Sequence, residues 1–177
     1  KERNAAVAAV AVLSASDHRL VDSAVACESI RFPYVPGYLS FREIPAAIKA
    51  MRALEVPPDM FLCDGQGIAH PRRLGVASHL GVLLDMPCVG VAKSKLIGIH
   101  DPVGEEKGSW GKLRHKNEAV GIVLRSRTGV KPIYVSCGHL VGLSSARDIV
   151  LRLLGKYRLP ETTRQAHALA GLKNVVL

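Results

Sequence analysis

The chain has 177 residues, 48% of them hydrophobic, which is enough to bury the core of a single domain. Lysine and arginine number 24 against 15 aspartate and glutamate, and this net charge of +9 favours a polyanionic partner, although an ordinary basic protein would also fit. The longest apolar run, Ala5 to Leu13, falls far short of the ~20 residues that span a bilayer, so we expect no membrane segment. The four cysteines lack CxxC spacing, which favours reduced thiols and a cytoplasmic location.

Hydrophobic periodicity predicts an α/β domain that begins with an antiparallel hairpin, Ala5–Ser14 and Leu20–Ile30. A rigid aromatic loop with two prolines follows, and then a helix that ends near Leu54. Two βα-type units come next, and the polar stretch 99–117 is expected to be an excursion from the core. The remaining elements are a second hairpin and two helices. The ranges predicted for the later elements are Met60–Cys63, Val76–Leu84, Cys88–Ala92, Ala119–Leu124, Ile133–Ser136, Ser144–Leu154 and a short helix from about Glu161.

Three candidate site residues lie just past the carboxyl ends of predicted strands: Asp64, Lys93 and His139. Ligand sites in open α/β sheets collect at the carboxyl ends of strands, and we therefore expect these side chains at one edge of the sheet. Asp64 begins a run of glycines and cations, an arrangement that suits a metal-binding acid beside a phosphate, although a turn aspartate before Gly65 is equally common. A lysine at a strand end is more often solvated than catalytic. His139 could be a metal ligand, a general acid or base, or a partly buried histidine whose hydrogen bonds are all made within the protein.

Glu43 has two interpretations. Ser40 and Glu43 have the spacing of a capping box, but Pro45 would then interrupt the helix that they cap. Pro45 favours a helix that begins at Pro45 itself, at the favoured first position for proline, and this start would leave Glu43 free to face the site. On spacing alone, a cap is still slightly more common than a ligand. The pair Cys137 and His139 has no second pair at ligand spacing, which argues against structural zinc.

Five blocks of sequence, in order and at compatible spacing, resemble the endonuclease V family. They are Pro33-Tyr34-Val35-Pro36-Gly37, Phe41-Arg42-Glu43, the segment from Asp64 to His79, Gly90-Val91-Ala92-Lys93 and Gly138-His139, and the segment 157–164 is also similar. The resemblance implies a ribonuclease H-like mixed sheet flanked by helices. It also implies a magnesium-dependent endonuclease, with manganese as a substitute, that cuts DNA at the second phosphodiester 3′ to deoxyinosine and leaves a 3′-hydroxyl and a 5′-phosphate.

The resemblance also implies roles for individual residues. Asp64 and Glu43 resemble metal ligands, while Lys93 and His139 complete the catalytic set. Tyr34, between Pro33 and Pro36, would be a wedge that fills the space of the flipped base. The other expected DNA contacts are His70, Arg72, Arg73 and His79, and the expected base pocket comprises Gly37, Leu39, Gly65, Gly67, Gly75 and Val76.

The family has one more catalytic aspartate, on a strand that would lie before Lys1. We therefore expect the single domain of residues 1–177 to be preceded by an N-terminal segment that carries this strand, since the strand is central in ribonuclease H-like sheets. We expect a monomer that acts on inosine-containing DNA, possibly also on RNA. Two alternatives are a nuclease for branched or inosine-containing RNA substrates and a non-catalytic module that binds the lesion.

Overall fold

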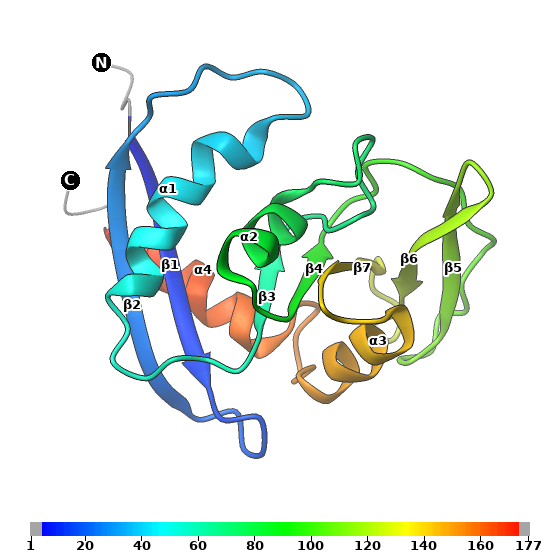
Figure 1. The fold of residues 1–177 in the computed structure, drawn as a ribbon. Coiled ribbons are helices and arrows are strands. Elements are labelled where there is room, and N and C mark those ends of the chain that lie inside the picture. Colours follow the sequence, from blue (N-terminus) through cyan, green and yellow to red (C-terminus); the bar gives the residue numbers. More distant parts are fainter. Residues whose placement is uncertain (1–4, 174–177) are drawn as a thin grey trace. The chain divides into compact units, whose positions relative to one another are not determined.

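The computed structural model describes residues 5–173, whose contacts divide the chain into two units, described separately below. Unit 1 comprises the described residues up to 58 and from 162 onward, and unit 2 comprises residues 59–161. Figure 1 labels the strands and helices of both. No helix within residues 5–173 has the length and apolar character that crossing a membrane requires.

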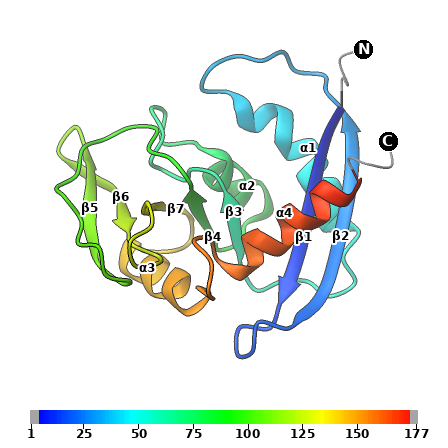
Figure 2. The ribbon, with the colours of Figure 1, turned by 180° about the vertical axis from the view of Figure 1, so that it is seen from behind.

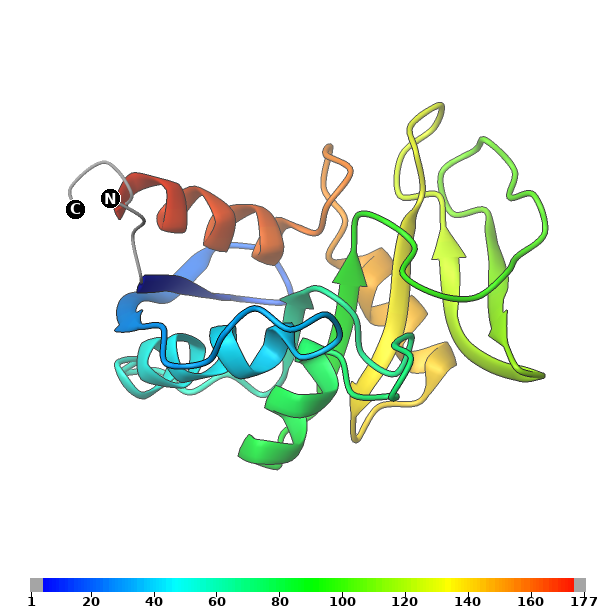
Figure 3. The same ribbon diagram turned by 90° about the horizontal axis from the view of Figure 1, so that it is seen from above.

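Unit 1 is built on the antiparallel hairpin of β1 (Ala5–Leu13) and β2 (Leu20–Ser29). Helix α1 (Leu39–Arg52) packs on this hairpin, and Lys49 Nζ anchors it through Glu28 Oε2 at 3.1 Å and the Cys27 carbonyl at 3.2 Å. Helix α4 (Glu161–Lys173) covers the opposite face of the hairpin from α1 (Figures 2 and 3). The hairpin is thus the middle layer of unit 1, and the sequence prediction of this hairpin is confirmed.

Helix α1 begins at Leu39, six residues earlier than predicted, and Pro45 lies inside it. The expected start at Pro45 is therefore wrong. Tyr38 is the N-cap residue and Ser40 is buried within the first turn, so the alternative of a capping box from Ser40 does not form either. The rings of Phe32, Tyr38 and Phe41 pack against one another with centroids 5.4–6.5 Å apart and hold this early first turn in place.

Unit 2 is a mixed five-stranded sheet in the order β3-β4-β7-β6-β5. Strands β3 (Phe61–Asp64) and β4 (Cys88–Ala92) are parallel, and β4, β7 (Ile133–His139), β6 (Glu118–Leu124) and β5 (Trp110–His115) pair antiparallel in turn. Helix α2 (Val76–Leu84) connects β3 to β4, and α3 (Leu143–Arg152) follows β7. The predicted α/β class, a mixed sheet flanked by helices, is confirmed.

The two faces of this sheet are covered by different helices. Val89 and Val91 of β4 belong to the main core together with Ala146 and Val150 of α3. Cys88 alternates to the other face, where it lies against Gly81 of α2. A second core on the α2 side contains Ala69, Leu113, Val120 and Val123. Because β4 is buried on both faces, the position of its carboxyl end is firmly fixed.

Strand β5 lies in the stretch that was expected to be an excursion from the core. Its sequence, WGKLRH, is that of an edge strand with exposed polar side chains, and only Leu113 is fully buried. Ile99 forms an isolated bridge to Arg114 on the outer side of this strand. Periodicity missed β5 because a single buried residue carries its hydrophobic signal.

Replacing Ile122, which is 1% exposed in the main core, tests whether this sheet supplies the stability of unit 2. We expect I122A to lower the free energy of unfolding by about 2–5 kcal/mol, since it removes packed methylenes and leaves a cavity. The matched control is I99A, because Ile99 is 75% exposed and the same truncation there should cost little. Equal losses for both variants in urea denaturation would contradict this description of the core.

Candidate functional site

Asp64 and Lys93 meet at the carboxyl edge of the two parallel strands. Asp64 is the last residue of β3 and pairs with Val91, while Lys93 follows the last residue of β4. Lys93 Nζ donates to Asp64 Oδ2 at 2.8 Å, and both side chains remain partly exposed, at 41% and 36%. The parallel register therefore brings together two of the predicted site residues, as the position of each at a strand end implied.

His139 lies at the other end of β4, and its expected location beside Asp64 is wrong. Strand β7 runs antiparallel to β4, so its last residue pairs with Cys88, the first residue of β4. His139 Nε2 is 3.1 Å from Asp85 Oδ1, at the C-terminus of α2. The carboxyl end of an antiparallel strand points to the opposite edge of the sheet, and the sequence did not reveal this direction. A catalytic role for His139 stays a prediction.

The glycines after Asp64 pack the backbone of their loop closely against the sheet. A Cβ on Gly67 would collide with the carbonyl of Cys137 on β7, and one on Gly75 would collide with the carbonyl of Gln66. The Gly67 N–H donates to the buried Ser136 Oγ at 2.8 Å. A Cβ on Gly65 would lie 2.5 Å from Val76 Cγ1, at the start of α2. Internal packing thus already requires glycine at positions 65, 67 and 75, whatever part they have in a base pocket.

Two histidines of this region favour the neutral form. Burial lowers the pKa of His70, and the charge of Arg72 lowers it further. His70 is 7% exposed, and its Nδ1 accepts a hydrogen bond from the Arg72 N–H at 3.3 Å. Burial likewise lowers the pKa of His79 on α2. These side chains would therefore meet a phosphate as hydrogen-bonding groups and not as cations at neutral pH.

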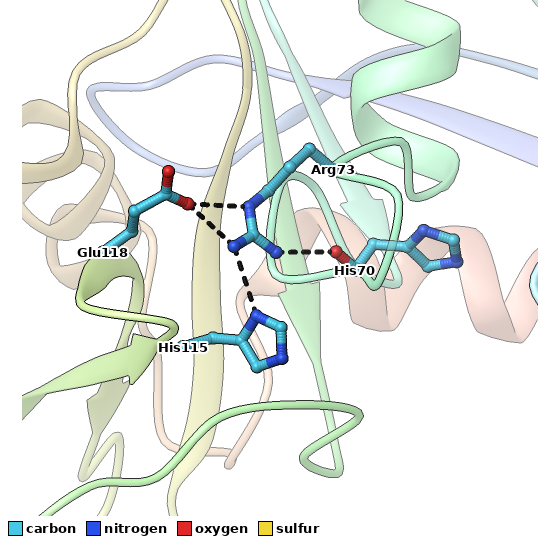
Figure 4. Close-up of polar contacts among 4 residues, drawn as sticks. All are labelled: His70, Arg73, His115 and Glu118. Atoms are coloured by element: carbon cyan, nitrogen blue, oxygen red, sulfur yellow. Dashed lines mark hydrogen bonds and ion pairs between the residues drawn. The ribbon is translucent and has the colours of Figure 1, made fainter.

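The guanidinium of Arg73 braces the same loop against the β5–β6 hairpin (Figure 4). Its Nε and Nη2 donate to Glu118 Oε2 at 3.1 and 2.7 Å, its Nη1 donates to the His70 carbonyl at 3.0 Å, and Nη2 lies 3.2 Å from His115 Nδ1. Arg73 also has φ of 58°, an uncommon conformation for a residue other than glycine. Sequence reasoning missed Glu118 and His115 because they lie more than 40 positions from Arg73 and because β5, which pairs with β6 there, was not predicted. A DNA contact by Arg73 stays a prediction, but its side chain has a defined internal role.

The remaining predicted residues lie in unit 1. Tyr34 is 66% exposed in the proline loop, and Arg42 Cζ lies 5.9 Å from the centroid of its ring. Tyr34, Leu39, Arg42 and Glu43 line an open hollow of about 290 Å³ together with Ala6, Val7 and Ile30. Gly37 has φ of 81°, which ends the loop just before α1. Glu43 is exposed on the first part of α1, inside the helix and not before it as a start at Pro45 would require. Its role in the site stays a prediction.

Asp64 has the chemistry of a ligand for a hard divalent cation. Its carboxylate supplies oxygen atoms, is partly open to solvent and already has an ammonium group 2.8 Å from Oδ2. Among the described residues, no three His, Cys, Asp or Glu side chains cluster closely enough to hold a metal ion together. The oxygen atoms of Asp64 are thus of the type that a hard divalent cation binds.

Replacing Arg73 by lysine tests the brace, because lysine keeps the charge and loses the fork that reaches several acceptors at once. We expect R73K to lower the free energy of unfolding by about 0.5–1 kcal/mol, a modest value because Glu118 is largely exposed. The control is R72K, the neighbouring exposed arginine. If thermal or urea unfolding shows R73K to be as stable as R72K, the brace contributes nothing measurable.

Comparison with known proteins identifies the family of the chain and its fold. The family model described as Endonuclease V matches residues 1–168. An endonuclease V from Rippkaea orientalis is 60% identical over 166 residues, which cover 94% of this chain and 72% of the relative. The crystal structure of endonuclease V from Streptomyces avermitilis superposes with a TM-score of 0.94 at 46% identity, covering 100% of this chain and 78% of that one.

A third relative is bound to DNA. It is endonuclease V from Ciona intestinalis in complex with a 24mer DNA that contains an inosine followed by a ribo-adenosine. This structure matches with a TM-score of 0.78 at 29% identity, over 97% of this chain and 86% of that one. The solved neighbours have a ribonuclease H-like fold, and the fold predicted from the sequence is therefore confirmed. With a family model that spans nearly all of its length and curated relatives at up to 60% identity, the chain belongs to the endonuclease V family of nucleases.

Proposed function

We propose that this protein is a magnesium-dependent endonuclease that hydrolyses the second phosphodiester bond 3′ to deoxyinosine and leaves a 3′-hydroxyl and a 5′-phosphate. The observation that carries the proposal is the Asp64–Lys93 pair at the carboxyl edge of β3 and β4, in a chain of this family. The Ciona intestinalis relative in complex with inosine-containing DNA supports the choice of substrate. The charge of +9 favours a nucleic acid partner independently of that relative.

Asp64 and Glu43 are the carboxylates that we propose as magnesium ligands. Bound there, magnesium would make water a better nucleophile and neutralise the leaving 3′ oxygen. Asp64 would orient that water for in-line attack on the phosphorus. Lys93, whose Nζ is 2.8 Å from Asp64 Oδ2, would place positive charge where negative charge grows on the phosphate oxygens in the transition state. Manganese is expected to substitute for magnesium because it accepts the same oxygen ligands.

The exposed groups of unit 1 suit recognition of the lesion. We propose that Tyr34 fills the gap left by an everted hypoxanthine, since its ring stands exposed between Pro33 and Pro36. Pro33 and Pro36 limit the freedom of this loop, so that little conformational entropy is lost when the ring inserts. From the family resemblance, the residues proposed to contact the flipped base are Gly37, Leu39, Gly65, Gly67, Gly75 and Val76. Arg72, Arg73, His70 and His79 are proposed to contact the DNA strand.

RNA is a second candidate substrate, and one observation favours it. The DNA in the Ciona intestinalis complex carries a ribo-adenosine directly after the inosine. A 2′-hydroxyl at that position distinguishes RNA from DNA for any protein that contacts it. Paired duplexes that differ only in this hydroxyl would show whether the present protein prefers it.

A nicking assay on a duplex with one inosine tests the proposed reaction. We expect the full-length protein to cut it in Mg²⁺ but not in EDTA, and to leave the matched adenine duplex intact. D64N should lower the rate at least ~100-fold while binding persists, because it removes a charged metal ligand and leaves the rest of the surface unchanged. The control, D148N, changes an exposed aspartate of α3 and should cut normally.

Three results of that assay would overturn the proposal. They are cutting of the adenine duplex at the same rate, cutting of branched DNA as fast as the inosine duplex, and normal cutting by D64N. Retention of the inosine duplex in Mg²⁺ without any cutting would select the non-catalytic binding module instead.

Substitution of Tyr34 tests the wedge separately from the chemistry. We expect Y34A to weaken binding to the inosine duplex about 10-fold, since base–aromatic stacking contributes ~1–3 kcal/mol. Y34F keeps the ring and should bind like the unaltered protein. Unchanged affinity of Y34A in a fluorescence anisotropy titration would remove Tyr34 from the recognition surface.

A further inference from the structure

Arg158 connects the loop after α3 to the strand end that carries Lys93. Its Nη2 donates to the Lys93 carbonyl at 2.6 Å and to the Pro132 carbonyl at 2.7 Å, and its Nε donates to the Lys131 carbonyl at 2.8 Å. One planar guanidinium thus joins the residue after β4 to the two residues before β7. Hydrogen bonds from a charged donor are roughly twice as strong as neutral ones, so this three-way contact is a firm one.

The Lys93 backbone needs such support because it lies just beyond the sheet. The β4 ladder ends with Ala92, which pairs with Tyr134, so Lys93 lies outside the regular pairing. The next carbonyl, that of Ser94, accepts a hydrogen bond from Gln66 Nε2 at 3.0 Å, and Gln66 lies two residues after Asp64. Two side chains from distant parts of unit 2 therefore hold consecutive carbonyls of the segment from which the Lys93 side chain extends toward Asp64.

We infer that Arg158 is a positioning residue for the cleavage reaction, which fixes the Lys93 backbone so that its ammonium group stays on Asp64. This inference rests on the proposed function of the Asp64–Lys93 pair. The lysine side chain is a flexible stem of four carbons. A contact to the Lys93 backbone can fix where this stem begins and still leave the ammonium group available to Asp64. Arg158 makes such a contact. Lysine cannot replace it, because a single ammonium on a flexible stem cannot reach three carbonyls in the fixed geometry of a guanidinium.

The chain supplies a matched control for this role. Arg125 also donates to three carbonyls, those of Gly104 at 2.9 Å, Val130 at 2.6 Å and Val103 at 3.1 Å. None of these residues belongs to the proposed site. R125K and R158K therefore remove the same kind of contact from the same unit, one away from Lys93 and one at it.

Single-turnover and steady-state nicking of the inosine duplex by the full-length protein would separate positioning from stability. We expect R158K to lower kcat about 10- to 100-fold with little change in KM, because small misplacements at a reacting centre cost rate and not binding. R125K should keep its kcat while losing a similar amount of thermal stability. In a K93M background, R158K should cause no further loss of kcat, because the group that it positions is gone.

Hydrogen exchange supplies a readout that does not depend on activity. R158K should speed exchange of the backbone amides in residues 93–98 and R125K should not, while R125K should speed exchange in residues 103–106. Equal falls in kcat for R158K and R125K, the same R158K penalty with and without Lys93, or unchanged exchange at 93–98 would each overturn the inference. If the unaltered protein fails to cut the inosine duplex, the proposed function fails, and the exchange of 93–98 alone decides whether Arg158 holds Lys93.

Discussion

The parallel pairing of β3 with β4 is the constraint on which the candidate site depends. It aligns the carboxyl ends of two buried strands, so that Asp64 and Lys93 emerge side by side with Nζ and Oδ2 2.8 Å apart. A carboxylate on a mobile loop would lose that alignment, whereas β4 is buried on both faces and cannot shift without disturbing the core. The chemistry proposed for the site therefore begins with sheet register.

The loop after Asp64 is rigid for reasons that are visible in its own packing. Gly67 and Gly75 let the backbone lie directly against Cys137 and Gln66, and Arg73 ties the far end of the loop to Glu118 on β6. Arg158 and Gln66 hold the segment after β4 in the same way, through its carbonyls. The glycines and arginines of these segments thus stabilise the structure of unit 2. An arginine in a nuclease motif need not contact a phosphate.

Most elements could be predicted from the sequence because hydrophobic periodicity is a local pattern. The position of Asp64 and Lys93 at one edge of the sheet could be predicted for the same reason, since each follows an apolar run. It placed His139 at the wrong edge, since the direction of β7 depends on pairing with β4 and leaves no mark on residues 133–139. Strand β5 was missed because only Leu113 is buried, and the start of α1 was misplaced because three aromatic rings, not proline chemistry, hold its first turn. Local signals were reliable, and signals that depend on partners far along the chain were not.

The most direct test of the account is where a divalent cation binds. Crystals of the full-length protein soaked in Mn²⁺ should show an anomalous peak at coordination distance, about 2 Å, from a carboxylate oxygen of Asp64. Cation binding would then compete with Lys93 for that carboxylate. A manganese peak beside Asp85 and His139, with none at Asp64, would contradict the assignment of Asp64 as the metal ligand.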